Sequence, residues 1–318
     1  MGGSGHWSLN NTLNNVVFAQ IKAIVINDSL EVTAETHVHF DSMLPEYRTS
    51  GGVHAGEGGR VTAPTIMWVH ALDMLMDKLR VAGVEFSSVR GISGAGQQHG
   101  SVYWRRGAGQ SLGACQPDKF LHTQLSSAFS VQDSPVWMDS STGAQCARLE
   151  EAAGGAERLA EVTGSRAYER FTGSQVRRLA ETRPECYNNT ERISLVSSFA
   201  ASLFTGTIVD IDWADAGGMN LLDINTKTWD ETLLEAVGPD LASKLGTPVE
   251  SNTVVGHASE YMQERSAYSN LTLASHLTFL PVRYGFSPDC AVAAFTGDNP
   301  SSLAGLAMKP GDIGIKSI

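Results

Sequence analysis

A short apolar run near the end of the chain stops at two polar side chains, and this break constrains the fold most strongly. Residues 291–295 read Ala-Val-Ala-Ala-Phe, and Thr-Gly then leads to Asp298 and Asn299 before a predicted helix. In α/β proteins, ligands bind in the crevice beside the carboxyl ends of the strands. Asp298 is therefore a candidate general base. Alternatively, Asp298 or Asn299 only caps a helix with Pro300 at its first position.

The N-terminal part of the chain predicts strands and one long helix. Residues 16–26 and 30–40 are rich in β-branched side chains, and Asn27-Asp28 between them indicates a hairpin of two long strands. Pro64 opens a predicted helix that Gly83 ends and that packs on a sheet. Its apolar face consists of Met67, Ala71, Leu72, Leu75 and Leu79.

The remaining pattern adds strands around a helical segment. Residues 89–93 predict a buried strand, and residues 101–104 predict a strand that returns beside it after a Gly-rich turn. Between roughly Thr142 and Gly206 the pattern is mainly helical, and a strand follows at Cys290. The apolar stripe of the last helix consists of Ile193, Val196, Phe199, Ala200 and Leu203. The order indicates an α/β or α+β layout with a helical insertion.

Composition excludes several classes of partner. The 318-residue chain has 42% hydrophobic residues, and its 23 basic against 34 acidic residues give a net charge of −11. This charge disfavours nucleic acid and anionic membranes and suits a small neutral substrate. The four cysteines form no zinc or disulfide pattern, and no apolar run approaches the length of a membrane span. We expect a cytoplasmic monomer without a metal-ligating cluster of its own.

The segment Gly94–Gly100 carries the second group of candidate residues. Its glycines do not match a dinucleotide fingerprint, because the third comes one place late and no helix is predicted after it. The glycines would let the backbone approach a ligand, while Gln98 and His99 offer hydrogen-bond donors and acceptors. This combination suits a polyhydroxylated molecule. A tight polar hairpin turn explains the same residues equally well.

Two further polar segments bear on ligand binding. In Pro135–Thr142, Trp137 stands two residues before Asp139, an arrangement that suits a sugar with its apolar C–H face on the ring and its hydroxyls on the carboxylate. Asp139 fits equally as the cap of a helix that begins near Thr142. Farther on, Arg166 and Arg170 would share a helical face, either as a solvated ion-pair cluster or with a guanidinium that fixes a ligand oxygen.

Four of these segments resemble one protein family. The stretches "SGAGQQHGS", "PVWMDSST", "GSRAYERFTG" and "FTGDNP" occur in the order and approximate spacing of the eukaryotic xylulose kinases of the FGGY carbohydrate kinase family. The resemblance runs from about Lys22 to about Ile313. It implies an α/β fold of the actin-like ATPase (ribonuclease H-like) type. In that fold an N-terminal domain binds the sugar and a C-terminal domain binds most of the ATP.

The resemblance also implies a reaction, in which ATP with Mg²⁺ phosphorylates D-xylulose to D-xylulose 5-phosphate. His99 and Arg170 fall on sugar-contacting positions, and Asp298 with Asn299 on an Asp-Asn pair whose Asp is the base. The expected substrate-binding residues are Gln98, His99, Trp137, Asp139, Arg170, Asp298 and Asn299.

Three departures from the family pattern qualify that expectation. Asn15–Ala19 stands where the family has the phosphate-facing turn Asp-x-Ser-Thr-Gln, residues 266–283 interrupt a stretch that is continuous in the family, and residues 314–318 diverge. We expect residues 1–313 to form the sugar-binding N-terminal domain, truncated before the nucleotide domain and therefore inactive as a kinase. The alternatives are a non-catalytic sugar-binding or regulatory fragment and a non-functional product.

Overall fold

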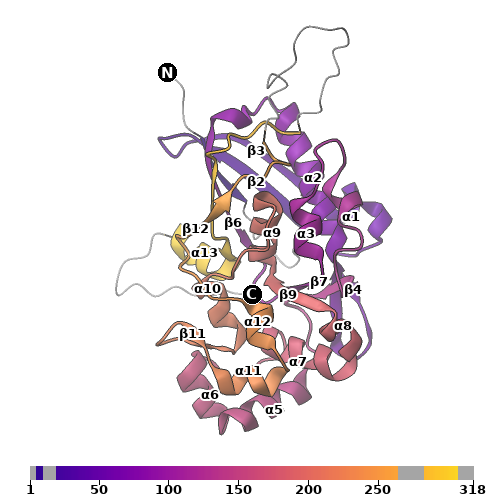
Figure 1. Cartoon of the computed structure of the whole chain (residues 1–318), viewed down its shortest axis with the longest axis vertical. Coiled ribbons are helices and arrows are strands. Elements are labelled where there is room, and N and C mark those ends of the chain that lie inside the picture. The colour runs from indigo at the N-terminus through magenta and orange to yellow at the C-terminus, as the bar shows by residue number, and fades with distance from the viewer. Residues whose placement is uncertain (1–4, 10–18, 264–282, 307–318) are drawn as a thin grey trace.

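One mixed β-sheet organises the upper half of the molecule in Figure 1. The structure, a computed structural model, describes residues 5–9, 19–263 and 283–306. The strand order is β12-β13-β6-β1-β2-β3, and β14 also pairs with β6. These strands are β1 (Gly5–Leu9), β2 (Gln20–Ile26), β3 (Val32–His39), β6 (Val89–Gly96), β12 (Val254–His257), β13 (Ala291–Ala293) and β14 (Thr296–Gly297).

The predicted N-terminal hairpin is confirmed in the part that the structure describes. β2 and β3 pair antiparallel from Gln20 opposite His39 to Ile26 opposite Val32. The Asn27 side chain closes the turn, because its Oδ1 accepts the backbone N–H groups of Ser29 and Glu31 at 3.0 Å. The predicted start of the first strand, residues 16–18, lies outside the described residues.

Two helices pack on this sheet. α2 (Thr65–Val81) contacts β2 and β3, and all five predicted face residues are buried, so this prediction is confirmed. α9 (Val196–Thr205) packs against β6. In the predicted apolar stripe, Ile193 is assigned wrongly, because it belongs to the strand β9 (Thr190–Leu195) that precedes α9.

The predicted return of residues 101–104 beside β6 is also wrong. β7 (Ser101–Arg105) pairs antiparallel with β9, as Ser101 opposite Leu195 shows. The reason is that both edges of β6 are already occupied. β1 pairs parallel with one edge, and β13 and β14 pair parallel with the other.

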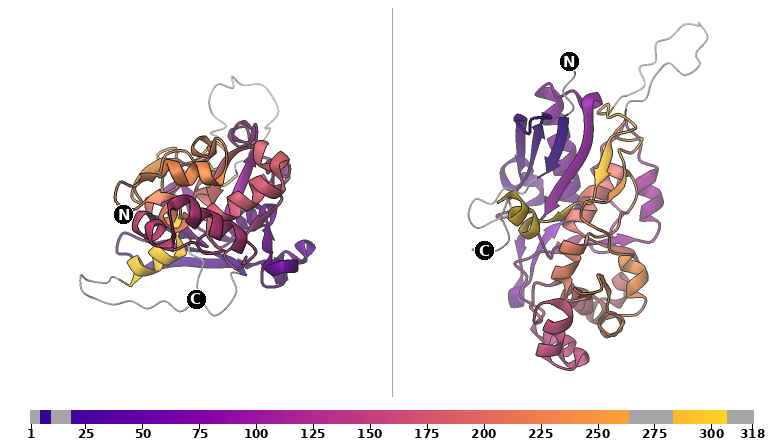
Figure 2. Two further views of the ribbon diagram at one scale, coloured as in Figure 1. Left: turned by 90° about the horizontal axis from the view of Figure 1, so that it is seen from below. Right: turned by 90° about the vertical axis from the view of Figure 1, so that its left-hand side faces the viewer.

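A helical part forms the lower half of the molecule, and the further views show the same division (Figure 2). Its hydrophobic core, which includes Leu149, Leu159, Val176 and Leu233, is separate from the core beneath the sheet. This arrangement confirms the predicted helical insertion. Its helices are α5 (Gly143–Ala153), α6 (Ala156–Thr163), α7 (Thr172–Thr182), α8 (Pro184–Asn188), α11 (Glu231–Val237) and α12 (Leu241–Leu245).

Short helices and strands complete the two parts. The helices are α1 (Phe40–Met43), α3 (Ala108–Gly113), α4 (Leu121–Gln124), α10 (Trp213–Ala216) and α13 (Asp298–Gly305). The strands are β4 (His54–Ala55), β5 (Val61–Pro64), β8 (Asp133–Pro135), β10 (Leu222–Asp223) and β11 (Thr228–Trp229). No helix in the described ranges combines the length and the apolar character that a bilayer crossing requires.

The departures from the family pattern fall almost entirely outside the described residues. This applies to residues 15–18, to residues 266–282 of the predicted insertion and to the divergent end at 314–318. The predicted domain limits at 1–313 stay a prediction for the same reason.

Candidate functional site

Asp298 lies where the last strand meets the last helix. β14 runs parallel to the end of β6, with Gly297 opposite Gly96, and α13 begins directly after it. The capping interpretation is wrong, because Gly297 is the N-cap residue and Pro300 is the third residue of the helix. The Asp298 side chain is 5% exposed, and its Oδ1 accepts the backbone N–H of Gln98 at 2.9 Å.

The Gln98 side chain ties the second candidate segment to the same place. Asn299 Nδ2 donates to Gln98 Oε1 at 2.5 Å. The sequence analysis expects the glycines of Gly94–Gly100 to let the backbone approach a ligand. At Gly96 this expectation needs correction, because the backbone there lies close to helix α9. A Cβ atom at Gly96 would lie 2.5 Å from the backbone nitrogen of Ser197. The glycine therefore lets the strand and the helix approach each other at the edge of the site.

His99 enters the site from a left-handed backbone conformation, with φ of 73°. Its ring is 8% exposed, its centroid lies 4.6 Å from that of Phe171, and its Nδ1 lies 3.0 Å from the carbonyl oxygen of Gly218. Burial lowers the pKa of His99 to about 4; the bond to Gly218 opposes this effect, and the charge of Arg170 adds to it.

This environment determines how His99 acts on a ligand. The imidazole is neutral at physiological pH because its pKa lies far below 7. Since a carbonyl oxygen only accepts hydrogen bonds, the Nδ1 atom facing Gly218 carries the proton. Nε2 of His99 is then a hydrogen-bond acceptor, which suits a hydroxyl donor.

Arg170 is held by aromatic rings. Residues 164–171 between α6 and α7 are not helical, so the predicted shared helical face of Arg166 and Arg170 is wrong. Arg166 pairs with Glu150 at 3.4 Å. The Cζ atom of Arg170 instead lies 4.8 Å from the ring centroid of Tyr168 and 5.4 Å from that of Trp137.

The partners of Arg170 leave its charge available. Within the described ranges no carboxylate lies within 4.0 Å of Arg170, so the ion-pair interpretation fails for this residue. Arg170 Nη2 donates a hydrogen bond to the Tyr168 hydroxyl at 3.4 Å, whereas its buried Nε has no hydrogen-bond partner among the described residues. The contact with the Trp137 ring places Arg170 beside one of the expected sugar contacts.

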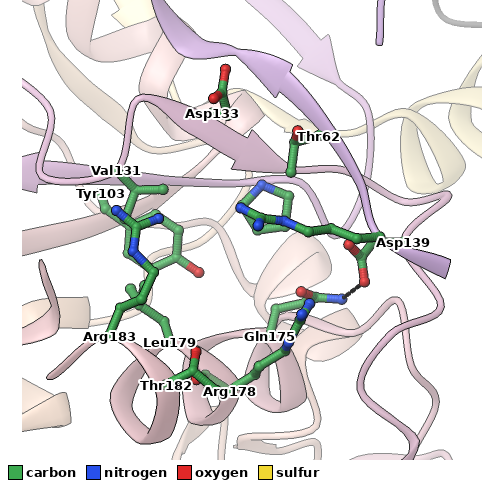
Figure 3. Close-up of a pocket in the computed structure, with 12 residues that line it drawn as sticks. Thr62, Tyr103, Val131, Asp133, Asp139, Gln175, Arg178, Leu179, Thr182 and Arg183 are labelled. Atoms are coloured by element: carbon green, nitrogen blue, oxygen red, sulfur yellow. Dashed lines mark hydrogen bonds between the residues drawn. The ribbon is translucent and has the colours of Figure 1, made fainter. Parts of the chain in front are cut away.

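Asp139 has a set of partners that the sequence does not predict. The carboxylate is 1% exposed, its Oδ2 accepts the N–H of Val61 at 2.9 Å, and its Oδ1 accepts Gln175 Nε2 at 2.8 Å (Figure 3). Its Oδ1 also accepts the N–H and the hydroxyl of Ser141. The N-cap of α5 is Thr142, so Asp139 is not that cap. These bonds connect β5 to α7 and occupy both carboxylate oxygens.

The structure adds a buried carboxyl pair that the sequence analysis misses. Asp212 caps α10, accepting the N–H groups of Ala214 and Asp215, and also accepts the hydroxyl of Thr296 at 2.9 Å. Asp215 is fully buried, and its Oδ2 accepts the hydroxyl of Ser197 at 2.5 Å. The available signal was the run Asp-Ile-Asp-Trp-Ala-Asp at 210–215 before Gly217-Gly218.

Asp215 is the more perturbed member of this pair. Its Oδ1 has no hydrogen-bond partner among the described residues, and a Cβ atom at Gly297 would lie 2.7 Å from it. Burial first, and then the charges of Asp212 and Asp298, raise the pKa of Asp215 well above its ordinary value. Asp215, with its raised pKa, lies directly behind Gly297, the residue that precedes Asp298.

Metal ligands are not grouped in the described part of the chain. Among residues 19–263 and 283–306, no three His, Cys, Asp or Glu side chains are positioned to share a metal ion. The described site consists of carboxylates, amide and imidazole groups, one guanidinium and aromatic rings.

Comparisons with known proteins agree with this description. The profile of the N-terminal domain of the FGGY family of carbohydrate kinases matches residues 130–271. The chain is similar to the xylulose kinase of Rattus norvegicus, with 50% identity over 297 residues, which are 93% of this chain and 52% of the relative. It is also similar to xylulose kinase 2 of Arabidopsis thaliana, with 45% identity over 93% of this chain and 50% of the relative.

A solved structure shows the same fold. The crystal structure of xylulose kinase from Rhodospirillum rubrum matches with a TM-score of 0.70 at 15% identity, covering 96% of this chain and 52% of that one. The actin-like α/β prediction is thereby confirmed for the described residues. The chain spans about half the length of the relatives that it matches.

Proposed function

Because this chain is similar to the FGGY family of carbohydrate kinases, we propose that it belongs to this family and provides the sugar-binding half of an ATP-dependent D-xylulose kinase. The observation that carries the proposal is the convergence of Gln98, His99, Asp298 and Asn299 from segments 200 residues apart. The similarity to enzymes named xylulose kinase supports D-xylulose as the sugar.

Asp298 is the proposed general base. Its carboxylate is fixed by the N–H of Gln98 and lies in the first turn of α13, where a negative charge is favoured by the helix dipole. It would accept the proton of the terminal sugar hydroxyl while that oxygen attacks phosphorus. General-base catalysis of this kind contributes roughly 10²- to 10⁴-fold in rate.

His99 and Arg170 are proposed to orient the sugar from the other side. Nε2 of His99 would accept a hydroxyl proton, and the guanidinium of Arg170 would donate to sugar oxygens while Trp137 and Tyr168 hold its plane. We propose that Trp137 also limits the space for the sugar, and that Asp139 supports the site without touching the ligand.

The proposed use of ATP and Mg²⁺ rests only on the similarity to the carbohydrate kinase family. They supply the phosphoryl group and the charge neutralisation that its transfer requires. The described residues contain no group of three metal-ligating side chains. We therefore assign this chain sugar binding and proton acceptance, and we expect negligible turnover when it is expressed alone.

Calorimetry with D-xylulose tests the proposal. We expect saturable binding to the chain, and we expect Arg170→Gln to weaken it by ~1.5–3 kcal/mol, the range for hydrogen bonds to charged groups. Arg166→Gln is the matched control, because Arg166 is exposed and pairs only with Glu150. Equal losses in the two variants, or no binding by the folded chain, would refute the sugar site.

A coupled ADP assay on the same samples separates the kinase from a purely sugar-binding protein. Sugar-dependent ADP release by the chain alone would contradict the expected lack of turnover. If sugar binds and no ADP appears, we expect turnover from a rebuilt enzyme in which the Asp-x-Ser-Thr-Gln turn replaces residues 15–19, residues 266–283 are deleted and the remaining half of a xylulose kinase is added. Failure of that reconstituted enzyme, with sugar binding intact, would favour the non-catalytic alternative.

A further inference from the structure

A cavity lies beside the Asp139–Gln175 pair, between β5, β8 and α7. Its volume is about 70 Å³, and its wall includes Arg60, Arg178 and Arg183 (Figure 3). A water molecule needs only ~10–15 Å³ on this measure, so the cavity has room for a group of several heavy atoms. None of the expected sugar contacts except Asp139 lines it.

The three arginines of this cavity are among those that have no acidic partner in the described part of the chain, whereas seven other arginines do. Within the described ranges no carboxylate lies within ion-pair distance of Arg60, Arg178 or Arg183. The arginines that do pair with an acidic side chain are Arg80, Arg148, Arg158, Arg166, Arg177, Arg192 and Arg283. Three like charges at one small cavity repel one another unless a counter-ion lies between them.

Most of the N–H donors of these three side chains are also uncommitted. Each guanidinium has five donors. Within the described chain, Arg178 donates to the Ser141 hydroxyl, Arg183 donates to Cys186 Sγ, and Arg60 makes no side-chain hydrogen bond. Several donors therefore remain at the cavity for a ligand that offers many acceptor oxygens.

The acidic groups at the cavity do not replace such a ligand. Both oxygens of Asp139 are occupied by Val61, Ser141 and Gln175. Asp133 is exposed at the edge of the cavity and forms no ion pair with the three arginines. Burial raises the pKa of the Tyr103 phenol, which therefore stays neutral.

We propose that this cavity binds a small phosphate-type oxyanion through Arg60, Arg178 and Arg183. Guanidinium groups match the geometry of phosphoryl oxygens and bind them through paired hydrogen bonds. The ligand is either free inorganic phosphate or the phosphoryl group of a small metabolite. The net charge of −11 disfavours unspecific anion binding, so affinity here depends on the local cluster.

Titration of the chain with inorganic phosphate, sulfate and glycerol 3-phosphate at constant ionic strength tests the proposal. Calorimetry should detect saturable binding, and tighter binding of glycerol 3-phosphate than of phosphate would identify a phosphorylated metabolite as the ligand class. Arg60→Gln and Arg178→Gln should each weaken binding at least about tenfold, as expected for charge-assisted hydrogen bonds.

The controls make the result unambiguous. Arg90→Gln removes the same charge from an exposed position outside the cavity and should leave anion affinity unchanged. Arg60→Gln keeps the test valid if Arg178→Gln fails to fold, because the exposed Arg60 side chain makes no hydrogen bond in the described chain. Absence of saturable binding, or equal weakening by Arg90→Gln, would overturn the proposal.

Discussion

The protonation state of His99 gives a measurable link between the site and the stability of the fold. Burial holds the pKa of His99 at about 4 in the folded protein, against 6.5 for an ordinary histidine. Unfolded chains therefore bind a proton at His99 between these pH values, and folded ones do not. The stabilisation from His99 is fully present above pH 6.5 and is lost as the pH falls towards 4.

The size of this effect follows from the same interval. One pH unit corresponds to 1.36 kcal/mol, so the interval from 6.5 to about 4 corresponds to roughly 3 kcal/mol. The side chain is only 8% exposed, so solvent screening reduces this figure little. We expect His99→Gln to remove the dependence, whatever its effect on stability at pH 7.

Urea unfolding at a series of pH values measures how the free energy of unfolding depends on pH in the wild type and in His99→Gln. The free energy of unfolding of the wild type should fall more steeply between pH 6.5 and 4.5 than that of His99→Gln. His37→Gln, at an exposed position of β3, controls for loss of a histidine as such. NMR titration of the His99 ring gives the direct answer, and a midpoint near 6.5 would refute the reasoning.

Two further predictions concern the groups behind the site. Burial raises the pKa of Asp215, so ionisation of this carboxyl costs stability as the pH rises. We expect Asp215→Asn to unfold at a higher temperature than the wild type at pH 8. The increase in unfolding temperature should be smaller at pH 4. A melting curve with no gain at pH 8 would contradict the raised pKa of Asp215. Gly96→Ala should lower the free energy of unfolding by ~1–3 kcal/mol or more, because its Cβ would meet the backbone of Ser197 at 2.5 Å. Urea unfolding checks this value, and a loss below ~0.5 kcal/mol would mean that β6 and α9 shift freely.

Local periodicity predicts those parts of the fold whose partners are close in sequence. The β2–β3 hairpin and the α2 face follow from alternation and from the helical repeat. The pairing of β7 does not follow, because the competition for β6 is decided by β1 at residues 5–9 and by β13 at residues 291–293. A strand pattern identifies a strand without identifying its neighbour.

The site shows the same limit. Asp298 and His99 are predicted because each follows a strand at a Gly-containing break. Asp215 lies in the four-residue helix α10, where an acidic residue is typical of a solvated surface. Its burial arises from packing against β14 and the N-terminus of α9, which the local sequence does not encode.

The position of β6 has a consequence for synthesis of the protein. One edge of β6 stays unpaired on the ribosome until β13 and β14 emerge, and the bond between Gln98 and Asp298 joins residues 200 positions apart. An unpaired strand edge is a template for another chain, so the nascent protein exposes a site for wrong pairing during this interval. The candidate site is consequently assembled only after β14 and α13 have been synthesised.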